Sequence, residues 1–116
     1  MGQFHSKVAG VTAKNDNGIS RQEYIQTYCK PNMNLILRRE PDNPHDSNAV
    51  AVLIKAKAFI FFSSEVQIGY LNSTVAKEIS RHMDSGEYVN AVITEITGGG
   101  KGKKSFGVNI LIDKVT

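Results

Sequence analysis

The chain has 116 residues, of which 41% are hydrophobic and 22% are charged. This size and composition are typical of one globular domain and exclude disordered and fibrous proteins. The formal net charge of +3 permits an anionic partner without requiring one.

Residues 7–12 are rich in β-branched side chains and alternate in character, which predicts a first strand. A turn rich in asparagine, aspartate and glycine follows at residues 14–18. A helix then begins, because Ser20 and Glu23 have the spacing of a capping box, in which each side chain bonds the other residue's backbone amide. Lys30 precedes a proline and ends this helix.

Two further strands are predicted at residues 34–39 and 49–55, where alternate side chains are apolar. The connection between them, residues 40–48, contains two prolines and several short polar side chains. It is more polar and rigid than a simple turn requires, since a two-residue Asn-Gly turn can join antiparallel strands. We therefore predict that this connection presents a surface on which its amides, imidazole and carboxylate meet one ligand.

Residues 59–71 predict a further strand, or one interrupted by the polar residues 63–65. Gly69 suggests a bulge or a close backbone approach within it. A helix that covers the core is predicted from Ser73, with Gly86 in the left-handed position after its end. Its apolar stripe consists of Val75, Ala76, Ile79 and Met83.

Residues 88–97 and 105–115 predict two closing strands, and the glycine- and lysine-rich residues 98–104 predict a mobile hairpin loop between them. No repeat or linker divides the chain, so residues 1–116 are expected to form a single domain. The expected fold class is mainly β with two helices, an α+β fold whose six strands curl into a small β-barrel. A chain of this length does not cover both faces of a wide open sheet.

The sequence also restricts the compartment. No apolar run approaches the roughly 18 residues that span a bilayer, and residues 1–10 lack the basic and apolar regions of a secretory signal. The single cysteine, Cys29, has no partner for an internal disulfide and excludes a cysteine-rich zinc site. We therefore expect a cytoplasmic protein that does not contact a membrane.

Motifs of common enzymes are missing from the sequence. The glycine-rich loop has Lys103 where a phosphate-binding loop needs glycine, and it leads into a predicted strand rather than a helix. The histidines His5, His45 and His82 do not have metal-ligand spacing, and no nucleophile elbow or zinc-protease helix is present. We therefore expect no enzyme activity, no cofactor and no bound metal.

Five segments, taken in chain order, resemble the HIRAN domain family over nearly the whole chain. They are residues 8–11 with Asn15 and residues 18–22, residues 35–52, residues 67–71, residues 96–99 and residues 107–108. The second segment is the most specific and reads Leu35-x-Leu37-x-Arg39-Glu40-Pro41-x-Asn43-Pro44-x-Asp46-x-Asn48-Ala49-Val50-x-Val52. The resemblance implies a small barrel of the OB-like or SH3-like kind with two added helices.

HIRAN domains occur free-standing in bacteria, which this chain looks like, and fused to DNA-remodelling helicases in eukaryotes. In the fused members an Asn-Pro-aromatic-Asp turn holds the 3′-hydroxyl end of single-stranded DNA. The resemblance implies that Asp46 accepts a hydrogen bond from the 3′-hydroxyl, His45 stacks on a base, and Asn43 bonds a phosphate or shapes the turn. Asn48 closes the same turn. The family resemblance thus implies a non-enzymatic module that binds the ends of single-stranded DNA in DNA repair or replication-fork processing.

The residues after the first strand depart from this pattern, because the fused members carry an arginine and tyrosines where this chain has Val11, Thr12 and Ala13. We expect other side chains to take over the phosphate and base contacts. The candidates are Arg21 and Gln22 at the start of the first helix, Tyr70, and the lysines Lys14, Lys101, Lys103 and Lys104.

Simpler roles stay open for several of these residues. Asn43, and to a lesser degree Asp46, is also suited to capping backbone groups in a proline-rich turn. Arg21 has Glu23 or Glu40 as alternative ion-pair partners. Tyr70 fits the rim of the core, and the lysine loop fits a solvated hairpin tip.

Two other functions compete for the whole chain. The first is a protein-interaction or dimerisation module without DNA binding, in which the apolar side chains Phe59, Phe61 and Phe62 mediate self-association. The second is a metal-dependent hydrolase acting on DNA, which requires metal-ligating carboxylates that the sequence does not group together.

Overall fold

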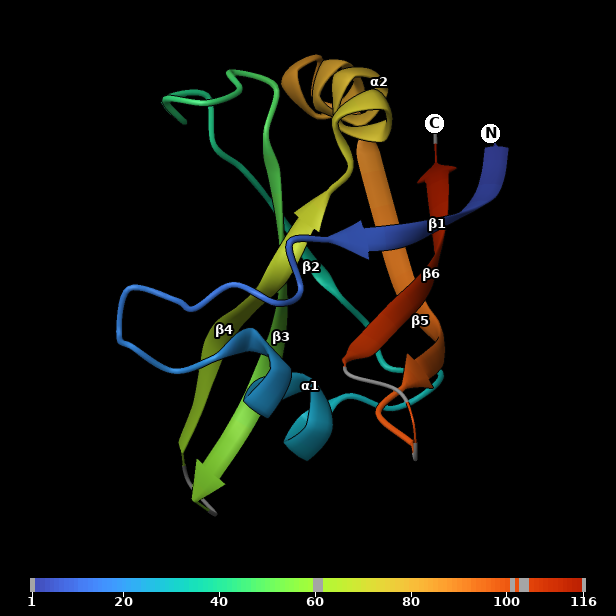
Figure 1. The fold of residues 1–116 in the computed structure, drawn as a ribbon. Coiled ribbons are helices and arrows are strands. Elements are labelled where there is room, and N and C mark those ends of the chain that lie inside the picture. The colour runs from blue at the N-terminus through green and yellow to red at the C-terminus, as the bar shows by residue number, and fades with distance from the viewer. Residues whose placement is uncertain (1, 60–61, 101, 103–104, 116) are drawn as a thin grey trace.

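The computed structural model describes residues 2–59, 62–100, 102 and 105–115. Within them the chain forms six strands and two helices, which confirms the predicted α+β class (Figure 1). The elements are β1 (Gly2–Ala9), α1 (Arg21–Tyr28), β2 (Ile36–Arg39), β3 (Val50–Phe59), β4 (Phe62–Leu71), α2 (Ser73–Asp84), β5 (Tyr88–Gly98) and β6 (Phe106–Val115).

The strands form one antiparallel sheet in the order β2-β3-β4-β1-β6-β5. β1 joins its two halves, since β1 pairs with β6 along most of its length and with β4 at its end. The sheet curls until its edges meet just before β2. There the Leu35 amide donates to the Ala91 carbonyl at 2.9 Å. The Ile93 amide donates to the Met33 carbonyl at 2.9 Å, so the sheet closes into the predicted barrel.

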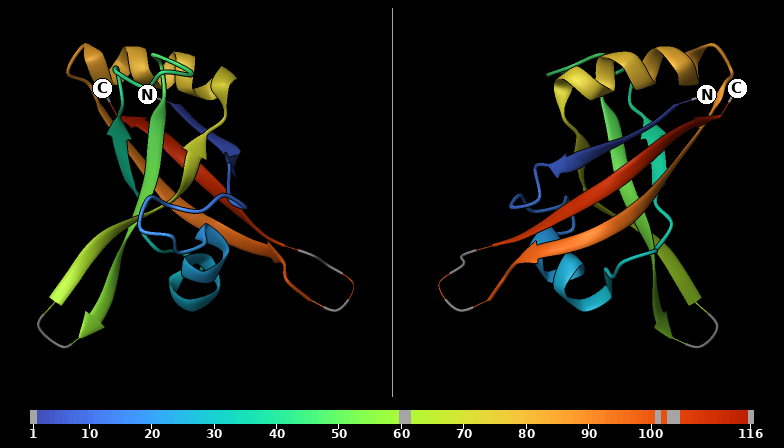
Figure 2. Two further views of the ribbon diagram at one scale, coloured as in Figure 1. Left: turned by 60° about the vertical axis from the view of Figure 1, so that its left-hand side comes forward. Right: turned by 90° about the vertical axis from the view of Figure 1, so that its right-hand side faces the viewer.

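The hydrophobic core fills the barrel, because alternate side chains of the strands point inward. The largest fully buried side chains are isoleucines from α1, four strands and α2, namely Ile25, Ile54, Ile68, Ile79, Ile93, Ile110 and Ile112. Figure 2 shows α2 across one end of the barrel and α1 toward the other. The two helices therefore seal the core that the sheet alone would leave open.

Both helices start near their predicted caps. The Asn72 side chain accepts from the Val75 amide at 3.0 Å, and Gly86 follows α2 with a φ of +83°. At α1 the Ser20 hydroxyl accepts from the Gln22 amide at 3.1 Å rather than from Glu23, so the cap is one-sided and not the predicted capping box. Within the described residues, no helix is long and apolar enough to cross a bilayer.

The first strand was predicted too late in the chain. β1 runs over Gly2–Ala9 instead of residues 7–12, because its pairing with β6 begins at Gly2. Gly10 then has a φ of +70°, a left-handed conformation that turns the chain out of the strand. Residues 11–12 consequently belong to the loop that leads to α1.

β3 and β4 form a long hairpin that extends beyond the barrel (Figure 2). The polar residues 63–65 lie inside β4, so the strand is not interrupted. Gly69 permits the predicted close approach, since a Cβ there would lie 2.3 Å from the Ala9 carbonyl oxygen. Of the proposed self-association residues, Phe61 lies outside the described residues, as do the side chains of Phe59 and Phe62.

Candidate nucleic-acid interface

An open groove of about 930 Å³ lies between the 40–48 connection, the loop before α1 and the β3–β4 hairpin. It brings together four of the predicted site residues, Arg21, Asn43, His45 and Tyr70. These side chains come from α1, from the 40–48 connection and from β4. Residues far apart in the sequence therefore share one surface.

Arg21 is the first residue of α1, and only 8% of its surface is exposed. Its Nε donates to Oδ1 of Asn15 at 2.8 Å, and its Nη1 donates to the Gly10 carbonyl at 2.9 Å. Asn15 is held in turn, because its side-chain Nδ2 donates to the Gln67 carbonyl at 2.8 Å. No ion pair of the described residues includes Arg21. Buried charges normally have a partner, so this groove offers a fixed cation to an anionic ligand.

Tyr70 links Arg21 to the 40–48 connection. The guanidinium carbon of Arg21 lies 5.5 Å from the centre of the Tyr70 ring, within cation–π range. The Tyr70 hydroxyl donates to Oε1 of Glu40 at 2.8 Å, and Nδ2 of Asn43 donates to the same oxygen at 3.0 Å. Tyr70 is half-buried and lies at the rim of the groove, where it connects the guanidinium of Arg21 to Glu40 at the start of the 40–48 connection.

Hydrogen bonds to the backbone fix the turn itself. Oδ1 of Asn43 accepts from the amides of His45 and Asp46, at 2.9 and 3.2 Å. Oδ1 of Asp46 accepts from the Asn48 amide at 2.8 Å. The capping roles weighed from the sequence are therefore present. Oδ2 of Asp46 makes no hydrogen bond within the described part of the chain, so one carboxylate oxygen stays available.

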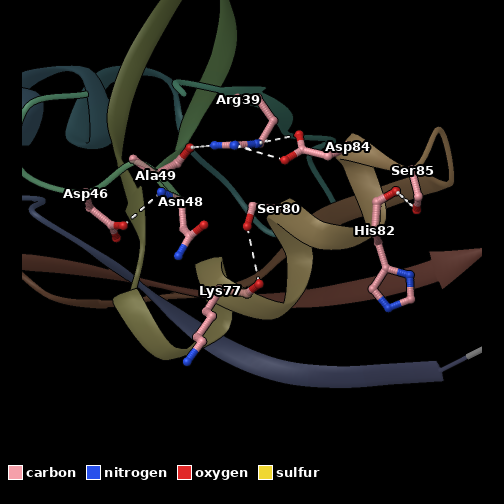
Figure 3. Close-up of polar contacts among 9 residues, drawn as sticks. All are labelled: Arg39, Asp46, Asn48, Ala49, Lys77, Ser80, His82, Asp84 and Ser85. Carbon is pink, nitrogen blue, oxygen red and sulfur yellow. Dashed lines mark hydrogen bonds and ion pairs between the residues drawn. The ribbon is translucent and has the colours of Figure 1, made fainter. Parts of the chain in front are cut away.

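Asp46 and Asn48 are not part of the groove lining. Figure 3 shows them with Arg39 and α2. Arg39 donates to the Ala49 carbonyl at 2.9 Å and forms an ion pair with Asp84, with one contact of 2.8 Å. The hydrogen bond from Arg39 lowers the pKa of Asp84 below its ordinary value. The base of the turn is thereby attached to the end of α2.

Gln22 contacts the backbone outside the groove. Its Nε2 donates to the carbonyls of Val11 and Phe106, at 2.9 and 3.0 Å, and its Oε1 accepts from the Phe106 amide at 2.6 Å. These bonds attach α1 to the start of β6. The side-chain oxygen and nitrogen of Gln22 are therefore both bonded to the backbone, and Gln22 is not brought together with Arg21 in the groove.

Two residues of the site were not singled out from the sequence. Asn15 positions Arg21, and Glu40 joins Tyr70 to Asn43. Both lie inside the segments that resemble the HIRAN family, which is the signal that could have identified them.

The predicted lysine contacts lie outside the groove lining or outside the described residues. Lys14 is exposed and lies next to the groove-lining residue Asn15. The loop lysines Lys101, Lys103 and Lys104 lie outside the described residues. Over the ranges that the structure describes, no group of three or more histidine, cysteine, aspartate or glutamate residues is arranged to hold a metal ion.

Comparisons with known proteins agree with this architecture. The family model for the HIRAN domain matches residues 1–112. The HIRAN domain of human HLTF superposes with a TM-score of 0.61 at 19% sequence identity, covering 97% of this chain and 77% of that one. A protein from Lactobacillus plantarum superposes with a TM-score of 0.55 at 17% identity, covering 97% of this chain and 99% of that one.

No curated protein sequence matches this chain significantly. The two structural matches show a shared fold, and the family match extends over nearly all of the sequence. It includes Asn15, Arg21, the 40–48 connection and Tyr70, which together build the groove. The chain therefore belongs to the HIRAN domain family.

Proposed function

We propose that this HIRAN domain is a non-catalytic nucleic-acid-binding module that grips the 3′-hydroxyl end of single-stranded DNA, in DNA repair or replication-fork processing. The observation that carries the proposal is Arg21, a residue that is 8% exposed and lines the groove without an ion-pair partner among the described residues. Arginine matches the geometry of phosphate through paired N–H donors. A phosphate of the DNA backbone supplies the missing anion.

The turn at the edge of the groove supplies the remaining contacts. His45 is exposed there and stacks on a base, a contact worth about 1–3 kcal/mol for an aromatic ring and less for imidazole than for tyrosine. Oδ2 of Asp46 accepts a hydrogen bond from the terminal hydroxyl. An internal phosphodiester has no such donor, so an acceptor at this position distinguishes strand ends.

Lysines extend the phosphate contacts beyond the groove. Lys14 is exposed beside it, and Lys101, Lys103 and Lys104 in the β5–β6 loop add positive charge. Each lysine that contacts a phosphate of a single strand should contribute about 0.7 to the slope of log affinity against log salt concentration.

Titration of labelled oligonucleotides tests the proposal. One single-stranded sequence is prepared with a free 3′-hydroxyl and with a 3′-phosphate, and binding is followed by fluorescence anisotropy. We expect the free hydroxyl to bind about ten- to a hundredfold more tightly, from one hydrogen bond to a charged acceptor. In Asp46→Ala this preference should disappear.

Two results would count against the proposal at different levels. Equal affinity of the native protein for both ends would remove end recognition and leave general nucleic-acid binding. An absence of binding at low salt would remove nucleic acid as the ligand altogether.

A further inference from the structure

Glu40 is the carboxylate at the centre of the hydrogen-bond network in the groove. It lines the groove and is half-buried. Its Oε1 accepts two hydrogen bonds, from the Tyr70 hydroxyl at 2.8 Å and from Nδ2 of Asn43 at 3.0 Å. Its Oε2 has no hydrogen-bond or ion-pair partner in the described part of the chain. Glu40 therefore presents a fixed acceptor oxygen without a donor.

The other charges of the groove limit where a phosphate can bind. Two of its three arginines are ion-paired, Arg38 with Glu65 and Arg39 with Asp84. Arg21 alone among the groove arginines lacks an ion pair within the residues described. The groove carboxylates without an ion pair in that same part of the chain are Asp16, Glu40 and Asp42. One phosphate is thus favoured beside Arg21, whereas a second one is repelled.

We propose that Glu40 is a specificity-determining residue of the groove, whose unbonded oxygen and negative charge exclude a terminal phosphate, while the single proton of a terminal hydroxyl is donated to Asp46. This inference rests on the proposed function and names a second carboxylate that reads the strand end. Tyr70 sets the spacing, because its ring lies 5.5 Å from the Arg21 guanidinium carbon and its hydroxyl bonds Glu40. Tyr70 thereby holds Glu40 on the same wall of the groove as the Arg21 guanidinium.

Asn43 couples the two carboxylates of the site. Its Nδ2 donates to Glu40, while its Oδ1 accepts from the Asp46 amide. Glu40 lines the groove itself, whereas Asp46 is outside the groove lining. Asn43 and Tyr70 are therefore positioning residues, which act on the ligand through the orientation of Glu40.

The test uses the full chain and one labelled single-stranded oligonucleotide with three different ends: a 3′-hydroxyl, a 3′-phosphate and a 3′-hydrogen. The measured quantity is the ratio of the affinities for the hydroxyl and phosphate ends, from fluorescence anisotropy. In Glu40→Gln we expect this ratio to fall about tenfold, because the like-charge repulsion of the phosphate end is lost, whereas the ratio of the affinities for the hydroxyl and hydrogen ends should stay unchanged. Glutamine keeps an amide oxygen for Tyr70 and Asn43, so the fold should be retained.

Asp42→Asn is the matched control. It removes a carboxylate from the same groove that makes no side-chain hydrogen bond within the described residues. We expect all three ends to gain affinity equally and the ratio to stay unchanged. If Glu40→Gln does not fold, Tyr70→Phe takes its place, because it removes one of the two donors to Oε1 and should lower the ratio by a smaller factor.

Each outcome is decisive. An unchanged ratio in Glu40→Gln, with loss in Asp46→Ala, overturns the proposal and assigns the discrimination between the two ends to Asp46 alone. An equal fall in Asp42→Asn also overturns it, since only the total charge of the groove would then matter. An unchanged ratio in Tyr70→Phe, if that is the variant that folds, has the same consequence. Failure of the proposed function is visible separately, because the native protein would then not prefer the hydroxyl end.

Discussion

Arg39, the last residue of β2, donates two hydrogen bonds to the carboxylate of Asp84, the last residue of α2, at 2.8 and 3.1 Å. The bonded guanidinium lowers the pKa of Asp84. A carboxyl whose pKa is lower in the folded state stabilises the fold above its unfolded pKa, and this contribution is lost as the pH falls through the folded pKa.

Asp84→Asn should therefore lower the melting temperature slightly at neutral pH. The difference from the native protein should vanish in acid, where the native carboxyl is itself protonated. Thermal unfolding followed by circular dichroism at several pH values measures both effects. Asp16→Asn is the control, because Asp16 is exposed and forms no ion pair within the described residues. A difference that persists in strong acid would show that the Arg39–Asp84 pair is not its cause.

Arg21→Gln should weaken the binding of single-stranded DNA and reduce its dependence on salt. Removal of one phosphate contact lowers the slope of log affinity against log salt concentration by about 0.7. Anisotropy titrations over a range of salt concentrations give this slope. Arg38→Gln changes another arginine of the same groove whose charge is already paired with Glu65. Equal changes of slope in the two variants would argue against a specific phosphate site at Arg21.

Gly69→Ala should destabilise the barrel. A Cβ at this position would lie 2.3 Å from the Ala9 carbonyl oxygen and 2.5 Å from Cγ1 of Val8. We expect a loss of at least about 1–3 kcal/mol in the free energy of unfolding, the usual effect of overpacking, measured by urea denaturation. Gly100→Ala serves as the control, because among the described residues, its chain neighbours aside, no atom lies within 4 Å of its added Cβ. Similar stability of the two variants would contradict the close approach of β1 and β4.

Cys29 should react slowly in the folded protein. Burial raises the pKa of its thiol to about 11, from an ordinary value of 9.0. Since the thiolate is the reactive form, two pKa units reduce its fraction about a hundredfold at pH 8. Reaction with a disulfide reagent at this pH should therefore be slow and should accelerate in denaturant. Equally fast labelling of native and unfolded protein would show that the thiol is accessible and ionised.

Local sequence signals predicted the elements that depend on local contacts. Asn72 caps α2, and Gly86 takes the left-handed conformation after it, as their positions indicated. The extent of β1 was not predictable in this way, because its first residues are extended by pairing with β6 at the other end of the chain. Ser20 caps α1 as expected, but its choice of the Gln22 amide depends on the local backbone geometry.

The sequence likewise predicted part of the candidate site. The family resemblance identified Asn43 and Tyr70, which the fold brings into one groove. It did not show that Glu40 joins them, because this contact depends on side-chain positions across two strands. Gln22 was assigned to the ligand, although its amide bonds the backbone of Phe106 far along the sequence, a contact without a local signal.

The closure of the barrel before β2 has a consequence for its motion. Few backbone bonds hold this seam, among them those of Leu35 and Ile93, whereas continuous ladders hold β1 to β6 and β5 to β6. Amides in such a seam exchange with solvent through smaller openings than those in the centre of a sheet. β2 leads directly from the seam into Glu40. One short strand thus separates a seam that few backbone bonds hold from the wall of the groove, so we expect motion of the seam to reach Glu40 along β2.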